Sequence, residues 1–273
     1  MAGLLLRFLY HTAPGRLLLK PLTARGLSVA CGRFLDSRAS RVLIPGFVRR
    51  AGIDLADYES STFACFNDCF TRRIRPELRP IAPDRRDLIA PCDGKLTVWP
   101  IEADTVIPVK QSQYSVSRLL GDEALARTFE GGWCLVFRLC VEDYHRYCYF
   151  DSGAKGENIF LPGRLHTVRP IALAKVPVFT ENCRAYTVIR SETFGQAVQM
   201  EVGAVPVGRI QNHDGPGPCV RGAEKGYFSY GGSTILLLLP PGRAEIRPEI
   251  LANSGTGVET PVKLGQTVGR ATA

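Results

Sequence analysis

From Asp87 onward the chain is a succession of short apolar runs, each closed by glycine, proline or aspartate after a few residues. This pattern is typical of short strands joined by tight turns. The runs that we expect to form strands are Leu96–Trp99, Trp133–Val141, Tyr144–Phe150, Ala185–Arg190, Ala197–Val202, Val205–Gln211, Gly226–Tyr230 and Thr234–Leu239. The chain is therefore predicted to be mainly β (α+β), with an antiparallel body that resembles a β-sandwich or barrel and a helical N-terminal segment.

The first 60 residues have a different composition, in which leucine and phenylalanine clusters alternate with arginine and lysine, with breaks at Pro14, Pro21 and Pro45. Such stretches are typical of basic amphipathic helices. Residues 1–50 hold nine basic side chains and a single acidic one, Asp36, and so account for the whole net charge of +8. The rest of the chain is electrically neutral. This argues against a nucleic-acid partner, because such proteins carry their charge on the domain that binds.

We expect residues 1–60 to form a basic amphipathic segment and residues 61–273 to form the folded domain. A segment of this kind can lie on an anionic bilayer, with its aliphatic groups among the acyl chains and its arginines among the headgroups. The alternative is a set of ordinary helices that pack on the body and leave their arginines in water. No apolar run approaches the ~20 residues of a membrane-spanning helix.

Several chemistries lack the residues that they need. The nine cysteines are scattered without a CxxC pair, which is typical of reduced core thiols in a cytosolic protein. The chain has four histidines and no HExxH, P-loop, GxGxxG or GxSxG motif, so no metal site, nucleotide site or hydrolase elbow is predicted. One unusual feature is left, the run Gly231–Thr234 (GGST) before a strongly apolar strand. In isolation this run indicates only a turn that enters the strand.

Four segments in order resemble the phosphatidylserine decarboxylase proenzyme family, over roughly residues 60–270. They are Phe66–Ile81 (FNDCFTRRIRPELRPI), Ala90–Gly94 (APCDG), Asp143–Cys148 (DYHRYC), and Glu224–Phe228 (EKGYF) followed by Gly231–Thr234. The first is similar to an aromatic-rich segment of the family that ends in Arg-Pro-Ile. It overlaps the run Phe63–Ile74, in which Phe63, Phe66 and Phe70 have helical spacing. The others are similar to an Asp-Gly turn, an Asp-Tyr-His-Arg-x-His element and the self-cleavage segment.

The resemblance implies a self-processing enzyme that converts phosphatidylserine to phosphatidylethanolamine with release of carbon dioxide. Cleavage between Gly232 and Ser233 would give a β chain of residues 1–232 and an α chain of residues 233–273. Ser233 would become a covalent pyruvoyl group, the electron sink that decarboxylation at an amino acid needs. The chain shows no recognisable pyridoxal-phosphate site that could take this part.

The resemblance implies the catalytic residues Asp93, His145 and Ser233, and we add His166 as a candidate for the place of a missing histidine. Ser233 is the nucleophile, Asp93 the carboxylate that orients a base, and His145 the histidine that assists decarboxylation. Cys148 stands where the family has a second histidine, commonly read as the base for self-cleavage. Three substitutes are open: His145 serves both steps, Cys148 acts as a thiolate, or His166 occupies the same space. A hairpin through Asp151–Gly156 would bring His166 beside Cys148.

The expected partners follow from this function. They are phosphatidylserine, an anionic phospholipid membrane surface, and the β and α chains of one precursor, with a homodimer as a further expectation. We expect the protein to be peripheral, on the cytoplasmic side of the cell membrane. The missing second histidine suggests an alternative function, a processing-deficient, non-catalytic β domain that binds lipid or a protein partner.

Overall fold

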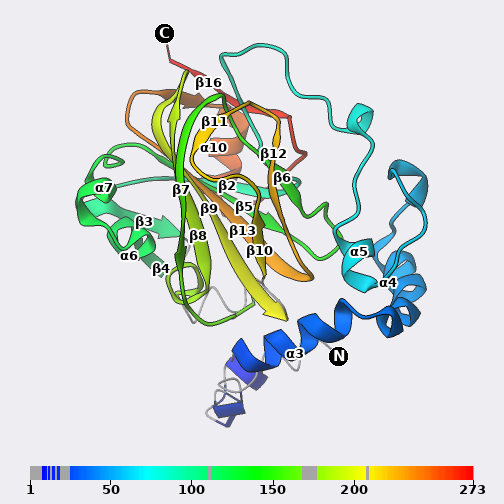
Figure 1. Ribbon diagram of the computed structural model, residues 1–273. Coiled ribbons are helices and arrows are strands. Elements are labelled where there is room, and N and C mark those ends of the chain that lie inside the picture. The colour runs from blue at the N-terminus through cyan, green and yellow to red at the C-terminus, as the bar shows by residue number, and fades with distance from the viewer. Residues whose placement is uncertain are drawn as a thin grey trace.

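The computed structural model describes residues 8–10, 12, 14–15, 17–18, 25–109, 112–167, 177–206 and 209–272. An eight-stranded antiparallel sheet forms the centre of this part of the chain (Figure 1). From edge to edge its strands are β11 (Gly217–Cys219), β7 (Gly153–Leu161), β8 (Arg184–Ser191), β9 (Gly195–Pro206), β13 (Gly231–Leu239), β5 (Trp133–Leu139), β2 (Gly94–Pro100) and β15 (Thr260–Val262). The prediction of a mainly β, antiparallel fold is confirmed.

Smaller sheets complete the β structure. They are a three-stranded sheet of β10 (Ile210–Asn212), β12 (Glu224–Phe228) and β6 (Arg146–Cys148), another of β1 (Asp87–Ile89), β16 (Thr267–Ala271) and β14 (Ala244–Ile246), and the hairpin of β3 (Val106–Val109) with β4 (Ser112–Ser115). Helices α6 (Val116–Leu120), α7 (Glu123–Arg127), α9 (Val178–Glu181) and α10 (Pro248–Gly255) and the short turn η4 (Ala103–Thr105) lie between strands.

Apolar side chains cover both faces of the large sheet, so β13 is apolar without interruption after Thr234. Ile235 and Leu237 belong to a core cluster that includes Phe228 and Tyr147. The even-numbered leucines of β13 belong to a second cluster that includes Tyr10. Because successive side chains of a strand point to opposite faces, Ser233 faces the first cluster and Thr234 faces the second.

A helical N-terminal part covers one end of the large sheet, where α3 contacts β9 (Figure 1). Its elements are α3 (Arg25–Leu35), η1 (Arg38–Leu43), α4 (Ile44–Ala51), η2 (Leu55–Asp57), α5 (Phe66–Phe70) and η3 (Pro76–Leu78). The helix predicted over residues 63–74 is real but short, because Thr71 already caps α5. Its phenylalanines Phe66 and Phe70 pack with Leu35 and Phe47 in a third core cluster. Most of residues 1–24 lie outside the described part, so the predicted helices there are untested.

Two details of the sequence-based strand assignment are wrong. The apolar run over residues 205–211 is not one strand, because β9 extends to Pro206 and β10 begins separately at Ile210. Residues 151–156, expected to be a turn, already contain the start of β7 at Gly153. All nine cysteines are free thiols, as expected. Among the described residues, no helix has the length and apolarity needed to cross a bilayer.

Candidate active site

Ser233 lies in the centre of the large sheet, near the end that the N-terminal helices cover. It is fully buried, opposite Leu139 of β5 and Gly203 of β9. Its Oγ atom has no hydrogen-bond partner, although a buried hydroxyl normally has one. The register between β13 and β9 is irregular between Gly231 and Ser233, where two steps on β13 correspond to three on β9. The peptide bond between Gly232 and Ser233 therefore lies at a bulge, where the ladder is disrupted.

His145 approaches the same end of the sheet from the segment before β6. Its Nε2 atom lies 2.8 Å from the carbonyl oxygen of Cys140, the residue after Leu139. Since a carbonyl only accepts, Nε2 carries the proton and Nδ1 carries the lone pair. Nδ1 is buried and has no hydrogen-bond partner. The ring packs against Phe70 with a centroid distance of 4.3 Å, and against Phe228 at 6.5 Å.

Burial decides the charge of His145. Complete burial lowers the pKa of the imidazole to about 3; the hydrogen bond to Cys140 opposes this shift and the Arg72 cation adds to it. The ring is therefore neutral at pH 7 and Nδ1 carries a free lone pair, which this burial makes only weakly basic. This atom and Ser233 Oγ are two buried polar atoms without partners near the end of β5.

A turn that sequence reasoning passed over orients His145. The carboxylate oxygen Oδ2 of Asp143 accepts a hydrogen bond from the Cys140 amide at 2.6 Å, and the Asp143 amide donates to the Cys140 carbonyl at 3.0 Å. This is the geometry of a turn closed by an aspartate side chain. The same carbonyl then holds the histidine ring. The spacing of Asp143 three residues after Cys140 was the available signal.

Asp93 lies directly before β2, which is separated from the Ser233 strand by β5. A side chain at the next residue, Gly94, would come within 2.8 Å of the Arg138 carbonyl on β5, so glycine allows this close strand approach. The Asp93 carboxylate is held by Arg79 Nε at 2.8 Å and Nη2 at 2.5 Å, and by the Leu264 amide at 2.9 Å. Among the described residues, its hydrogen bonds join it to this arginine and this amide and not to a histidine.

The predicted position of His166 is wrong. Strand β6 pairs with β12, not with the segment around residue 166, so no hairpin brings His166 beside Cys148. The backbone N–H of His166 instead donates to the Asn182 side chain, and the Asn182 side-chain amide donates back to the His166 carbonyl, both at 2.8 Å. The His166 Nδ1 atom lies 3.4 Å from the hydroxyl of Tyr10. Tyr10 belongs to the core cluster on the Thr234 face. His166 therefore lies on the face of the sheet opposite to the Ser233 side chain, and its catalytic role stays a prediction.

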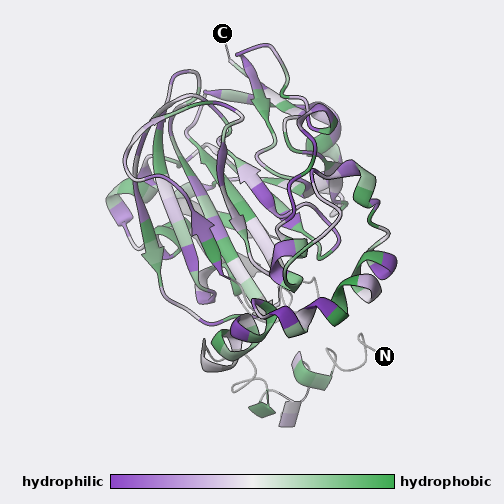
Figure 2. Ribbon diagram, turned by 45° about the vertical axis from the view of Figure 1, so that its right-hand side comes forward, coloured by the Kyte–Doolittle hydropathy of each residue, from purple (hydrophilic) through white to green (hydrophobic). Residues whose placement is uncertain are grey.

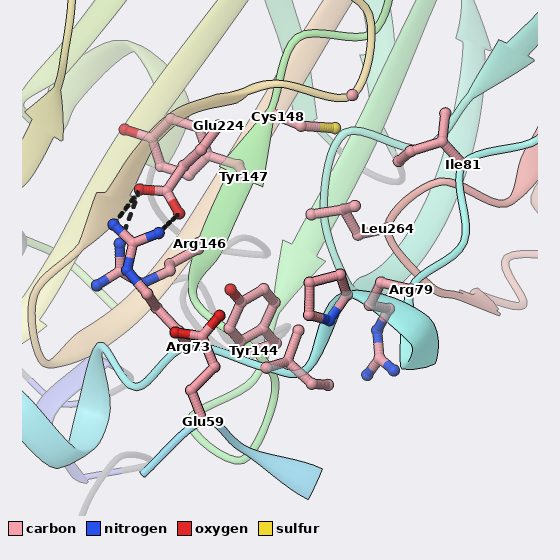
Figure 3. A pocket seen from close by; sticks show the side chains of 13 residues that line it. Glu59, Arg73, Arg79, Ile81, Tyr144, Arg146, Tyr147, Cys148, Glu224 and Leu264 are labelled. Atoms are coloured by element: carbon pink, nitrogen blue, oxygen red, sulfur yellow. Dashed lines mark hydrogen bonds and ion pairs between the residues drawn. The ribbon is translucent and has the colours of Figure 1, made fainter.

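Cys148 lies in the wall of a pocket of about 230 Å³ (Figure 3). Arg73, Arg146 and Glu224 form one side of this pocket, and Ile81 and Leu264 the other. Complete burial raises the pKa of the Cys148 thiol to about 12. The thiol is therefore protonated near neutral pH and is not available as a base.

Chemically, the arrangement fits attack by a serine on its own peptide bond. A nucleophile needs an adjacent base and an accessible carbonyl. The structure brings Ser233, a peptide bond that lies opposite a bulge in β9, and a neutral imidazole to one end of the sheet. Of the four predicted catalytic residues, Ser233 and His145 lie on one side, Asp93 lies two strands away in the sheet, and His166 lies on the far face.

Comparison with known proteins identifies the family of the chain. The sequence profile of the family described as phosphatidylserine decarboxylase matches residues 66–270. Phosphatidylserine decarboxylase proenzyme 2 of Clostridium acetobutylicum is 41% identical over 265 residues, which is 97% of this chain and 91% of that protein. The phosphatidylserine decarboxylase proenzyme of Ruminiclostridium cellulolyticum is 40% identical over 273 residues, 98% of this chain and 91% of that protein. The chain therefore belongs to the phosphatidylserine decarboxylase family.

Proposed function

We propose that this chain is a proenzyme that cleaves itself between Gly232 and Ser233 and then decarboxylates phosphatidylserine to phosphatidylethanolamine. The observation that carries the proposal is the buried Ser233 hydroxyl. It has no hydrogen-bond partner and lies next to its own peptide bond, where the pairing between β13 and β9 is bulged. A buried hydroxyl without a partner is unfavourable in a purely structural serine. The family membership supplies the reaction class.

Self-cleavage follows from the groups present. The Ser233 Oγ attacks the carbonyl carbon of Gly232, its proton passes to His145 Nδ1, and the proton moves on to the nitrogen that leaves. An ester replaces the peptide bond at this point. Loss of the Cα proton of residue 233 then breaks the Cβ–O bond, which frees the Gly232 carboxylate and leaves dehydroalanine. One water hydrolyses this residue to a pyruvoyl group and releases ammonia.

The residues present fit the formation of this group, since the serine that would form it lies beside the strand bulge and near a neutral imidazole. Once formed, the pyruvoyl group supplies the electron sink for decarboxylation. We retain His145, on the same side of the sheet, as the residue that assists decarboxylation. Asp93 and its Arg79 partner hold the start of β2 in place, and we retain Asp93 as the carboxylate of the site.

His166 is retained as a secondary residue of the site. It is linked through Asn182 to β9, the neighbour of the Ser233 strand: the Asn182 side-chain amide donates to the carbonyl of Gly203 at 2.8 Å, opposite Ser233. This indirect contact supports a role in holding β9, and it favours His145 over His166 as the base for self-cleavage.

The outer side of the N-terminal helices supports a peripheral position on an anionic membrane. Large apolar side chains there are exposed: Val29, Phe34, Val42 and Leu43. Exposed arginines lie among them: Arg33, Arg38, Arg41, Arg49 and Arg50. The helices along the lower edge of the molecule accordingly alternate between apolar and polar segments (Figure 2). A mixed apolar and cationic surface suits an anionic bilayer.

Helix α5 of the same N-terminal part covers the cleavage segment. The ring of Tyr230 packs edge-on against Phe66 and Phe70, at centroid distances of 4.9 and 5.1 Å. Membrane attachment by these helices would therefore bring the reaction centre close to a lipid substrate. We propose that these helices bind the cytoplasmic face of the cell membrane. We also propose that the protein assembles as a homodimer.

Mass spectrometry and a liposome assay test the function together. The purified 29.9 kDa chain is expected to resolve into two fragments, the smaller beginning with a pyruvoyl group at position 233. Liposomes containing phosphatidylserine are expected to release carbon dioxide with this protein and not with the Ser233→Ala variant. An intact chain without activity would overturn the proposal and favour a non-catalytic lipid-binding domain.

A further inference from the structure

Lys225 and Glu201 form an ion pair with no exposed surface at all. The Lys225 Nζ atom lies 2.9 and 3.0 Å from the two carboxylate oxygens of Glu201, and both side chains are completely buried. Asn212 completes the cluster: its Oδ1 accepts from Lys225 at 3.0 Å, and its Nδ2 donates to Glu201 at 3.0 Å. The hydroxyl of Tyr147 donates to the same Oδ1 at 3.0 Å.

Stability alone is a weak explanation for this ion pair. Removing two charges from water costs several kcal/mol per ion. Replacing a buried pair with apolar side chains of similar volume is often neutral or stabilising. Phe228, Tyr147 and Ile235 already form an apolar cluster in this layer, so an apolar solution is available to the fold.

The position of the pair suggests what it does. Glu201 lies on β9 directly opposite Ile235, two residues after Ser233. Lys225 lies on β12, three residues before Phe228, whose amide donates to the carbonyl of His145 at 3.0 Å. The pair thus joins the sheet that carries the nucleophile to the strand beside the proposed base.

The pair also anchors the segment that leads to the cleavage site. After Lys225 the chain runs through residues 226–230 and returns to β9 at Gly231, which pairs with Pro206. Residues 226–228 of this segment pair with β10 and β6, while the ion pair and the large sheet attach the chain to β9 before and after it. A side chain at Gly226 would come within 2.1 Å of the Gln211 carbonyl, so the segment has no room to shift toward β10.

We propose that Lys225 and Glu201 are positioning residues for self-cleavage. They keep residues 226–230 in position, so that the Gly232 carbonyl carbon stays within reach of Ser233 Oγ. The inference rests on the self-cleavage proposed above. Losing the anchor leaves the chemistry intact and loosens only the approach of the two atoms. A misplacement of about 1 Å in such an approach can cost on the order of 100-fold in rate.

The test uses the full chain, made by cell-free synthesis and followed over time on gels. The key variant is Lys225→Met with Glu201→Met, which removes both charges together. Stability is measured by thermal unfolding in a Ser233→Ala background, where every variant stays uncleaved. A matched control is Asp151→Asn, a buried carboxylate that accepts from Ser191 Oγ at 2.5 Å at the opposite end of β8. Its rate of self-cleavage is compared with that of the Glu201→Gln variant, which changes the other buried carboxylate in the same way.

The double variant is expected to unfold within a few degrees of the parent and to cleave itself about 10- to 100-fold more slowly. Asp151→Asn is expected to cleave at the parent rate. Hydroxylamine, which cuts esters, should release no extra fragment from the double variant, because the ester does not accumulate. A stable double variant that cleaves at the parent rate, or an ester that hydroxylamine traps in it, would overturn the inference. A parent chain that does not cleave would instead refute the proposed function.

Discussion

The Nε2 atom of His145 lies 2.8 Å from the carbonyl oxygen of Cys140. This one contact fixes both the tautomer and the position of the ring, because the carbonyl belongs to the residue that follows the cross-strand partner of Ser233. The nucleophile and the proposed base are therefore placed by the same strand end. Their relative position depends on backbone geometry and not on a direct side-chain contact with a carboxylate.

His145→Gln is expected to slow self-cleavage at least about 100-fold, in the range usual for loss of a general base. Glutamine keeps a donor for the Cys140 carbonyl but has no lone pair basic enough to take the serine proton. His166→Ala is expected to slow cleavage only a few-fold, since His166 lies on the other face of the sheet. Time courses of chain cleavage measure both. The reverse order of effects would reassign the base to His166.

Asp143→Asn is expected to slow self-cleavage about 10-fold, because an amide accepts the Cys140 N–H less strongly than a carboxylate does. The loss would come from poorer orientation of His145 rather than from loss of its lone pair. Asp143→Asn and His145→Gln should therefore be non-additive in the double variant. Additive effects would show that the turn acts independently of the histidine.

The buried state of His145 predicts a pH dependence of stability. Its pKa is about 3 in the folded chain and near 6.5 when unfolded. The unfolded state thus binds one more proton between these values, and the free energy of unfolding falls as the pH drops below 6.5. The expected slope from this residue is about 1.4 kcal/mol per pH unit. Urea titrations of the Ser233→Ala protein, with and without His145→Gln, should differ by this slope between pH 6.5 and 5.

Much of the fold could be predicted from the sequence, because strands and turns leave a local pattern of residue types. Alternation and turn residues identified β2, β5, β8, β12 and β13 close to their true bounds. The three-residue strand β14 left no such signal, since its pairing with β16 is long-range. The strand β7 was missed because Gly153 was read as a turn residue, whereas it begins a strand that pairs with β8.

The candidate site could be predicted from the sequence only in part. Motif order predicted Ser233 and His145, which the structure brings to one end of the sheet, but the order of segments along the chain does not give the pairing of strands. His166 was therefore expected beside Cys148, although β12 occupies the place beside β6. The Asp143 turn was inside a recognised segment, yet its role depends on a backbone carbonyl, which no sequence motif displays.

The exposed apolar side chains of the N-terminal helices predict a membrane contact. Phe34→Asp with Val42→Asp is expected to weaken binding to phosphatidylserine liposomes at least about 10-fold, since each charge opposes insertion of an apolar group. Self-cleavage should be unchanged, because neither side chain packs in the core. Val220→Asp, at another exposed valine, is the matched control in liposome sedimentation. Equal binding by all variants would place the contact elsewhere.

The last prediction concerns the cysteine that replaces a histidine of the family pattern. Cys148→Ala is expected to leave the rate of self-cleavage within about twofold of the parent. The reason is the thiol pKa of about 12, which leaves almost no thiolate at pH 7. Removing one buried sulfur should cost about 1 kcal/mol of stability through the small cavity left behind. Cell-free time courses at pH 7 and pH 9 measure the rate. A parent rate that rises with pH and a Cys148→Ala rate that does not would show that the thiolate is the base after all, and would move the centre of the reaction from the Cys140 turn to the pocket around Glu224.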